Sequence, residues 1–172
     1  MAIIKYENGS YRTSGELPPI GSRAPDVSLV NTRLQNVSLA NWMGLRKIIN
    51  IFVSIDTAVC AKSVIEFDRY ADGIDKLAML MVSYDLPFAH RRFQDQHKLK
   101  NVIGLSAIRH AGFGENYGVL IMDGPLAGMF ARAVVVLDEN NTVVHQEHID
   151  DIATEPDYAA AFRSLGISVE QD

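Results

Sequence analysis

The segment Lys47-Ile-Ile-Asn-Ile-Phe-Val53 constrains the fold of this chain more than any other. A β-branched apolar run of this length is typical of a strand that is buried on both faces, as in sheets covered by helices. Apolar residues then recur at helical spacing from Val64 to Ile74, and Leu77 to Ser83 forms a second buried run. This alternation of strand, helix and strand predicts an α/β fold.

The rest of the chain continues the alternation and adds a late hairpin. In chain order we expect a helix over Phe88–Lys98 entered at Pro87, a short strand over Val102–Leu105, strands over Ala131–Leu137 and Thr142–Gln146 on either side of Asp138-Glu-Asn-Asn141, and a last helix from Pro156 to about Leu165. This order predicts a thioredoxin-like fold, with a mixed central β-sheet flanked by helices.

A hairpin is expected at the N-terminus. Strand-like residues from Ile3 to Glu7 are followed by Asn8-Gly9, a pair that adopts the positive φ values of a tight turn. No repeat or low-complexity tract divides the sequence. We therefore expect residues 1–172 to be a single domain, with residues 1–16 as an N-terminal hairpin extension.

Charge and hydropathy exclude several kinds of partner. Sixteen Lys and Arg residues stand against 21 Asp and Glu residues, and the longest basic run is the pair Arg91-Arg92, so neither nucleic acid nor an anionic membrane surface is expected as a partner. No apolar stretch approaches the ~20 residues of a bilayer span. The first residues do not follow the pattern of a secretory leader, and the chain is expected in the cytoplasm.

Cys60 is the only cysteine, so no internal disulfide can form, which suits a reducing compartment. Any redox chemistry at this residue must therefore finish on another molecule. Cys60 falls in the first turn of the predicted helix, where free backbone N–H groups and the helix dipole favour a thiolate over a thiol. The alternative is an inert, buried cysteine that only fills space.

Two further residues are candidates for chemistry at the sulfur. Thr57 lies three residues before Cys60 and can aim its hydroxyl at the sulfur and at an incoming oxygen. The alternative role of Thr57 is an N-cap of the helix, and both roles can hold together. Attack of a thiolate on an O–O bond also requires donors that stabilise the departing oxygen. Arg132, just before the apolar run Ala133-Val-Val-Val136, is the cationic candidate, although an arginine at a strand start is usually solvated or paired with a carboxylate.

Five blocks of the sequence together resemble a known family. They are Phe52-Val-Ser-Ile-Asp-Thr57-Ala-Val-Cys60, Ser83-Tyr-Asp-Leu-Pro-Phe-Ala89, Gly124-Pro-Leu-Ala-Gly128, Ala131-Arg-Ala-Val-Val-Val136 and Thr154-Glu-Pro-Asp-Tyr158. In this order they resemble the thiol peroxidase (Tpx-type) branch of the peroxiredoxins, from about residue 21 to residue 165.

The resemblance implies a thioredoxin fold with an N-terminal hairpin, commonly a homodimer, and a thiol-dependent peroxidase activity without cofactor or metal. Cys60 matches the peroxidatic cysteine, whose thiolate attacks a hydroperoxide and becomes a sulfenic acid. Thr57 matches the threonine that hydrogen-bonds sulfur and peroxide. Arg132 matches the arginine that holds the thiolate and polarises the peroxide.

The sequence departs from the family pattern at two positions. Val53 stands where the family has a proline that covers the cysteine; valine keeps the apolar bulk but frees φ, so we expect slower turnover or easier overoxidation of Cys60. Gln94 stands where the family usually has a resolving cysteine. We therefore expect a one-cysteine cycle, in which an external thiol such as thioredoxin, glutathione or another small thiol reduces Cys60, or the sulfenic acid waits as a mixed or intersubunit disulfide.

Other functions have less support in the sequence. His145 and His148 lie at an offset that points them to opposite faces of a strand, and no Cys/His cluster surrounds them, so no metal site is expected. A disulfide reductase would need a C-x-x-C pair, but position 57 is threonine. The alternative that stays open is a degenerate family member acting as a redox sensor or an interaction module.

Overall fold

Three parallel strands form the middle of a seven-stranded sheet in the computed structural model, which describes residues 1–169. The sheet order is β4-β3-β7-β6-β5-β8-β9, and the outer strands β3, β8 and β9 run antiparallel to their inner neighbours. The strands are β3 (Leu29–Asn31), β4 (Asn36–Val37), β5 (Arg46–Ile51), β6 (Leu77–Ser83), β7 (Val102–Ser106), β8 (Ala133–Leu137) and β9 (Val143–His148).

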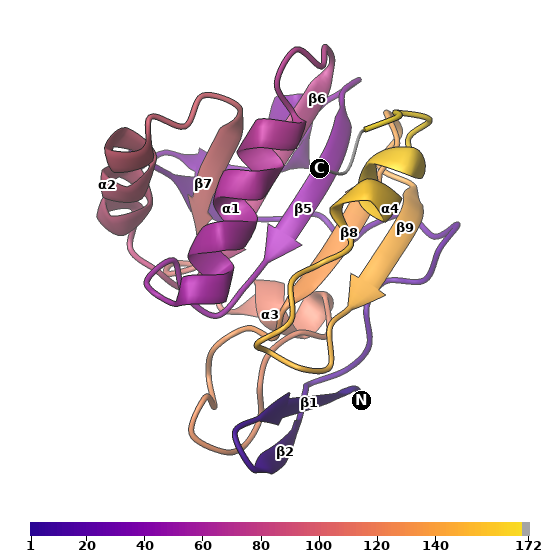
Figure 1. Cartoon of the computed structure of the whole chain (residues 1–172). Coiled ribbons are helices and arrows are strands. Elements are labelled where there is room, and N and C mark those ends of the chain that lie inside the picture. The colour runs from indigo at the N-terminus through magenta and orange to yellow at the C-terminus, as the bar shows by residue number, and fades with distance from the viewer. Residues whose placement is uncertain (170–172) are drawn as a thin grey trace.

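Helices cover the sheet on both faces. Figure 1 shows α1 (Ala58–Tyr70) crossing the front of the sheet, with α4 (Tyr158–Arg163) beside it and α2 (Pro87–His97) next to β7. The short α3 (Gly112–Asn116) packs through Phe113 into the core on the opposite face, together with the 3-10 helix over Leu39–Trp42.

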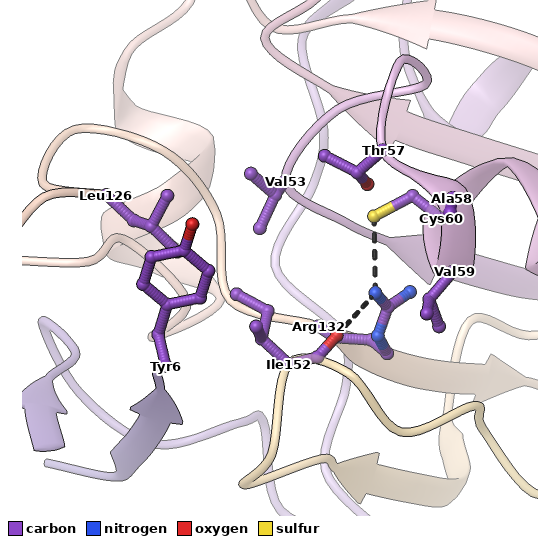
Figure 2. Close-up of a pocket in the computed structure, with 9 residues that line it drawn as sticks. All are labelled: Tyr6, Val53, Thr57, Ala58, Val59, Cys60, Leu126, Arg132 and Ile152. Carbon is purple, nitrogen blue, oxygen red and sulfur yellow. Dashed lines mark hydrogen bonds between the residues drawn. The ribbon is translucent and has the colours of Figure 1, made fainter. Parts of the chain in front are cut away.

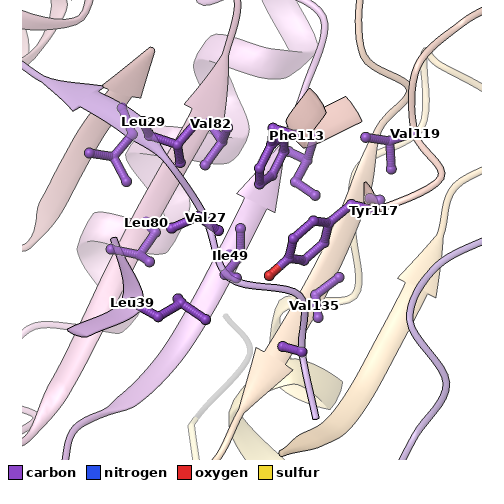
Figure 3. Close-up of a cluster of buried hydrophobic side chains, with 14 of the residues drawn as sticks. Val27, Leu29, Leu39, Ile49, Leu80, Val82, Phe113, Tyr117, Val119 and Val135 are labelled. Carbon is purple, nitrogen blue, oxygen red and sulfur yellow. The ribbon is translucent and has the colours of Figure 1, made fainter. Parts of the chain in front are cut away.

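The central strands have apolar side chains on both faces, as expected for buried parallel strands. Because side chains alternate along a strand, β5 sends Ile48 into the core beneath α1 and α4 and Ile49 into the opposite core. Figure 3 shows the second of these cores, in which the buried ring of Tyr117 lies near Ile49 and Val135. The Tyr117 hydroxyl donates a hydrogen bond to the Pro25 carbonyl at 2.8 Å, so its polar end is satisfied.

The N-terminal hairpin consists of β1 (Ile3–Tyr6) and β2 (Gly9–Arg12) and lies at one end of the molecule (Figure 1). Ile4 is fully buried in a small cluster with Ile121 and Ala131. The backbone N–H of Ile152 donates to the Lys5 carbonyl at 3.2 Å. These contacts fix the hairpin against the segment that precedes β8 and the segment that follows β9.

The structure confirms the mixed sheet, its flanking helices and the N-terminal hairpin. The first long helix ends at Tyr70 rather than Ile74, because the chain turns at Gly73, which has φ 73°. The strand predicted over residues 47–53 ends at Ile51. β4, α3 and the 3-10 helix were not predicted from the sequence; these elements have five residues or fewer and show little periodicity. None of the helices in residues 1–169 is long and apolar enough to span a membrane.

Candidate active site

Cys60 lies in the first turn of α1, directly after the loop that leaves the central strand β5. Its side chain is buried, with 1% of its surface exposed. Ser63, one turn further along α1, donates to the Cys60 carbonyl at 2.8 Å and accepts a hydrogen bond of 3.0 Å from the side chain of Asn50 on β5. This buried polar link fixes the start of α1 to the sheet, and with it the position of the sulfur.

Arg132 contacts the sulfur directly. It precedes β8, and the antiparallel pairing of Ala133 with Ile51 places it beside the end of β5, from which the Cys60 loop departs. Arg132 Nη2 lies 3.3 Å from Cys60 Sγ and 2.8 Å from the Ile152 carbonyl oxygen (Figure 2). The alternative of a solvated arginine is wrong, because only 1% of Arg132 is exposed.

A thiolate is the sulfur species that this arrangement stabilises. The guanidinium is permanently charged, and a buried ion contact is stronger than the same contact in water. The free N–H groups at the start of α1 add positive potential at the same place. Nε and Nη1 of Arg132 are buried without a hydrogen-bond partner among residues 1–169, so Nη2 is the guanidinium nitrogen that contacts the sulfur.

Thr57 occupies the N-cap position of α1, but its side chain makes no capping hydrogen bond. Instead, its hydroxyl donates to the Ser54 carbonyl at 2.9 Å, and its backbone N–H donates to the same oxygen at 3.1 Å. The hydroxyl hydrogen is therefore used, and the lone pairs of Oγ1 remain to accept a hydrogen bond. Figure 2 shows this oxygen on the side of the threonine that faces the sulfur.

A pocket with a cavity volume of about 170 Å³ opens onto these three residues. It is lined by Tyr6, Val53, Thr57, Ala58, Val59, Cys60, Leu126, Arg132 and Ile152. The polar groups stand together at the sulfur, and the side chains of Val53, Leu126, Ile152 and Tyr6 extend the pocket away from it (Figure 2). A dry apolar cavity of ~150 Å³ is enough to bind benzene, so an organic substituent of that size fits this volume.

Sequence reasoning brought together Cys60, Thr57 and Arg132, and the structure places all three in this pocket. It missed Tyr6, although the hairpin that carries this residue was predicted. Leu126 was missed although it lies in the block Gly124-Pro-Leu-Ala-Gly128, and Ile152 was missed because an isolated apolar residue in a loop carries no signal in the sequence. Val53, one of the two departures from the family pattern, is 7% exposed and forms part of the apolar wall.

Comparison with known proteins places the sequence in a family. The Redoxin family model matches residues 19–162. Thiol peroxidases from Corynebacterium glutamicum and Mycobacterium bovis are 42% and 44% identical to it, and each match covers 96% of this chain and 99% of the relative. The chain belongs to the thiol peroxidase family. A solved thiol peroxidase from Chromobacterium violaceum superposes with a TM-score of 0.88 at 25% identity, over 95% of each chain.

A peroxiredoxin-like protein from Aquifex aeolicus gives a TM-score of 0.89 at 29% identity, over 95% of this chain and 96% of that protein. Both superpositions confirm the thioredoxin-like fold of this thiol peroxidase.

Gln94, the second departure from the family pattern, lies on α2, where its side-chain amide donates to the Val102 carbonyl at 2.9 Å. Gln94 is not part of the Cys60 pocket.

The histidines of this thiol peroxidase do not gather around a common point. His148 Nδ1 lies 3.1 Å from Asp150 Oδ1. Burial lowers the pKa of His145, although the charge of Asp157 opposes this shift. No group of three or more His, Cys, Asp or Glu side chains within residues 1–169 is arranged to hold a metal ion.

Proposed function

We propose that this chain is a thiol-dependent peroxidase that reduces hydrogen peroxide or organic hydroperoxides at Cys60. The contact of 3.3 Å between Arg132 Nη2 and Cys60 Sγ carries this proposal, because it sets a permanent positive charge against a buried sulfur. The full-length similarity to thiol peroxidases supports the same activity.

The reaction at Cys60 is a displacement on oxygen. The thiolate attacks the terminal oxygen of the hydroperoxide, an S–O bond forms as the O–O bond breaks, and the cysteine becomes a sulfenic acid. The other oxygen departs as hydroxide or alkoxide and takes up a proton to become water or an alcohol. Thr57 Oγ1 accepts the hydrogen bond of the peroxide O–H, and the positive charge of the Arg132 guanidinium stabilises the negative charge that builds up on the oxygens.

Regeneration of Cys60 requires external thiols, because the chain contains one cysteine. A first thiol condenses with the sulfenic acid, releasing water and leaving a mixed disulfide. A second thiol then attacks this disulfide, frees Cys60 and leaves as the oxidised donor. Thioredoxin, glutathione or another small thiol is the proposed donor, and a cycle that depends on such donors suits the reducing cytoplasm.

A homodimer is the proposed assembly. Leu86 and Phe88 follow β6 and Ile108 follows β7, and each is at least half exposed. Since β6 and β7 are parallel neighbours, the segments that carry these apolar side chains leave the sheet at the same end, where a second copy can cover them. Sedimentation equilibrium measures this state directly, and a monomer at micromolar concentration would contradict it.

The activity is tested by peroxide consumption with a thiol donor, comparing the natural chain with Cys60→Ser. We expect peroxide consumption by the natural chain only. After one equivalent of peroxide, its intact mass should increase by one oxygen, and a sulfenic-acid reagent should trap the oxidised Cys60. Equal, negligible consumption by both proteins would favour the alternative of a degenerate redox sensor or interaction module. The presence of Cys60, Thr57 and Arg132 in one pocket supports the peroxidase over that alternative.

A further inference from the structure

The carboxylate of Asp85 ties two distant loops together next to the active site. Asp85 follows β6, in the turn that leads into α2. Its Oδ1 accepts a hydrogen bond of 2.8 Å from the Ser54 hydroxyl, and its Oδ2 accepts 2.7 Å from the Ile55 backbone N–H. Ser54 and Ile55 belong to the loop between β5 and α1. The turn after β6 thereby holds the loop that carries Thr57.

The Asp85 side of this contact is itself fixed by a buried network. The Ser83 hydroxyl donates to Asp85 Oδ2 at 2.6 Å, and its oxygen accepts the Asp85 backbone N–H at 3.1 Å. Because the Ser83 hydroxyl hydrogen is already donated to Asp85, the Ser83 oxygen can only accept from His90. The contact of 3.0 Å between Ser83 Oγ and His90 Nε2 therefore requires a proton on Nε2. Ser83 is fully buried and His90 is 2% exposed. Asp85 therefore has little freedom to move.

Further hydrogen bonds connect Ser54 to Thr57 within the same loop. The Ser54 hydroxyl, which donates to Asp85, also accepts the Asp56 N–H at 3.1 Å. The Ser54 carbonyl accepts both the N–H and the hydroxyl of Thr57. The position of Ser54 consequently decides where the Thr57 hydroxyl points, and Asp85 decides the position of Ser54.

We propose that Asp85 is a positioning residue for peroxide reduction. It keeps the loop from Phe52 to Thr57 in the arrangement in which the lone pairs of Thr57 Oγ1 face the sulfur and an incoming peroxide. This inference rests on the proposed function. Asp85 does not touch the reacting atoms and acts through Ser54.

Asp85→Asn is the direct perturbation. An ionised carboxylate accepts on both oxygens, whereas a carboxamide has one oxygen and two N–H donors. The amide can keep the Ile55 and Ser83 contacts only by turning its NH₂ group toward the Ser54 hydroxyl, which then loses its acceptor. A displacement of ~1 Å of a group that orients the substrate can cost ~100-fold in rate. We therefore expect the second-order rate constant of Cys60 oxidation by hydrogen peroxide to fall by ~10- to 100-fold.

Asp68→Asn is the matched control. Asp68 lies on α1, is half-buried like Asp85, and also accepts three hydrogen bonds on its carboxylate, here from the backbone N–H groups of residues 100, 101 and 102. These bonds hold the far part of α1 to the start of β7. All three bonds go to Oδ1, an oxygen that the carboxamide retains, so Asp68→Asn removes a carboxylate charge from α1 without moving the Thr57 loop.

Alkylation of Cys60 by iodoacetamide is the second readout, since it requires an accessible thiolate but no threonine to orient an oxygen. The inference is supported if Asp85→Asn lowers the peroxide rate at least tenfold, keeps the alkylation rate within threefold of the natural chain, and Asp68→Asn changes neither. It is overturned if the peroxide rate of Asp85→Asn stays within twofold of the natural chain, or if both rates change together.

Ser54→Ala decides the question if Asp85→Asn does not fold. It removes only the hydroxyl between Asp85 and the Asp56 N–H, and we expect a smaller drop in the peroxide rate with unchanged alkylation. An unaltered peroxide rate in a folded Ser54→Ala protein would overturn the inference. Absence of Cys60 oxidation in the natural chain would instead remove the proposed function, so the two failures are distinguishable.

Discussion

The buried His90 makes the stability of this protein depend on pH. Its ring is 2% exposed, and burial lowers the pKa of His90 to about 4 from an ordinary value of 6.5, although the nearby charge of Asp85 opposes the shift. The folded chain therefore keeps His90 neutral at pH values where the unfolded chain protonates it. Stability from this group is complete above pH 6.5 and is lost as the pH falls from 6.5 towards 4.

The magnitude follows from the gap between the two pKa values. One pKa unit corresponds to ~1.4 kcal/mol, so the full effect is about 3 kcal/mol. At pH 5, where the unfolded chain is mostly protonated at this position and the folded chain is not, about 2 kcal/mol of the free energy of unfolding is lost. For a protein with a total stability of ~5–15 kcal/mol this loss is easily measured.

Urea unfolding at pH 8 and at pH 5 measures the effect, with His90→Gln as the comparison. Glutamine can still donate to the Ser83 hydroxyl but does not titrate. Groups that do not interact with His90, including His145 with its lowered pKa, contribute equally to both proteins and cancel. We expect the natural chain to lose about 2 kcal/mol more than the variant between the two pH values. Equal losses in the two proteins would refute the reasoning.

Two further predictions concern the walls of the Cys60 pocket. Val53→Pro should raise the rate constant of Cys60 oxidation and slow the overoxidation of Cys60 to sulfinic acid, because proline fixes φ next to the pocket. Stopped-flow kinetics measure the oxidation rate and intact mass measures overoxidation. An unchanged or lower oxidation rate would contradict this prediction. Tyr6→Ala should slow the reaction of Cys60 with cumene hydroperoxide ~5-fold, because apolar contact with the organic substituent is lost, and should leave the rate with hydrogen peroxide within twofold of the natural chain. An equal loss of rate with both substrates would show that Tyr6 does not select the substituent.

Much of the site near Cys60 could be predicted because it is local. Thr57 and Cys60 are three residues apart, and the change from a buried strand to a helix between Ile51 and Ala58 places both at a helix N-terminus. The details were less predictable: Thr57 bonds the Ser54 carbonyl and not the helix end. Whether the threonine oxygen also accepts from a helix N–H depends on the side-chain rotamer and the local backbone geometry, and spacing alone does not determine these.

The alternation of strand and helix, the N-terminal hairpin and the single cysteine were determined by the sequence itself, because they depend on short-range periodicity, turn residues and a count. Which distant residues reach the sulfur was decided by the tertiary structure. The register of β5 with β8 brings Arg132 to Cys60, the turn after β6 brings Asp85 to Ser54, and the docked hairpin brings Tyr6 to the pocket. These contacts join residues 30 or more positions apart, and only the packed sheet brings them within reach of one another.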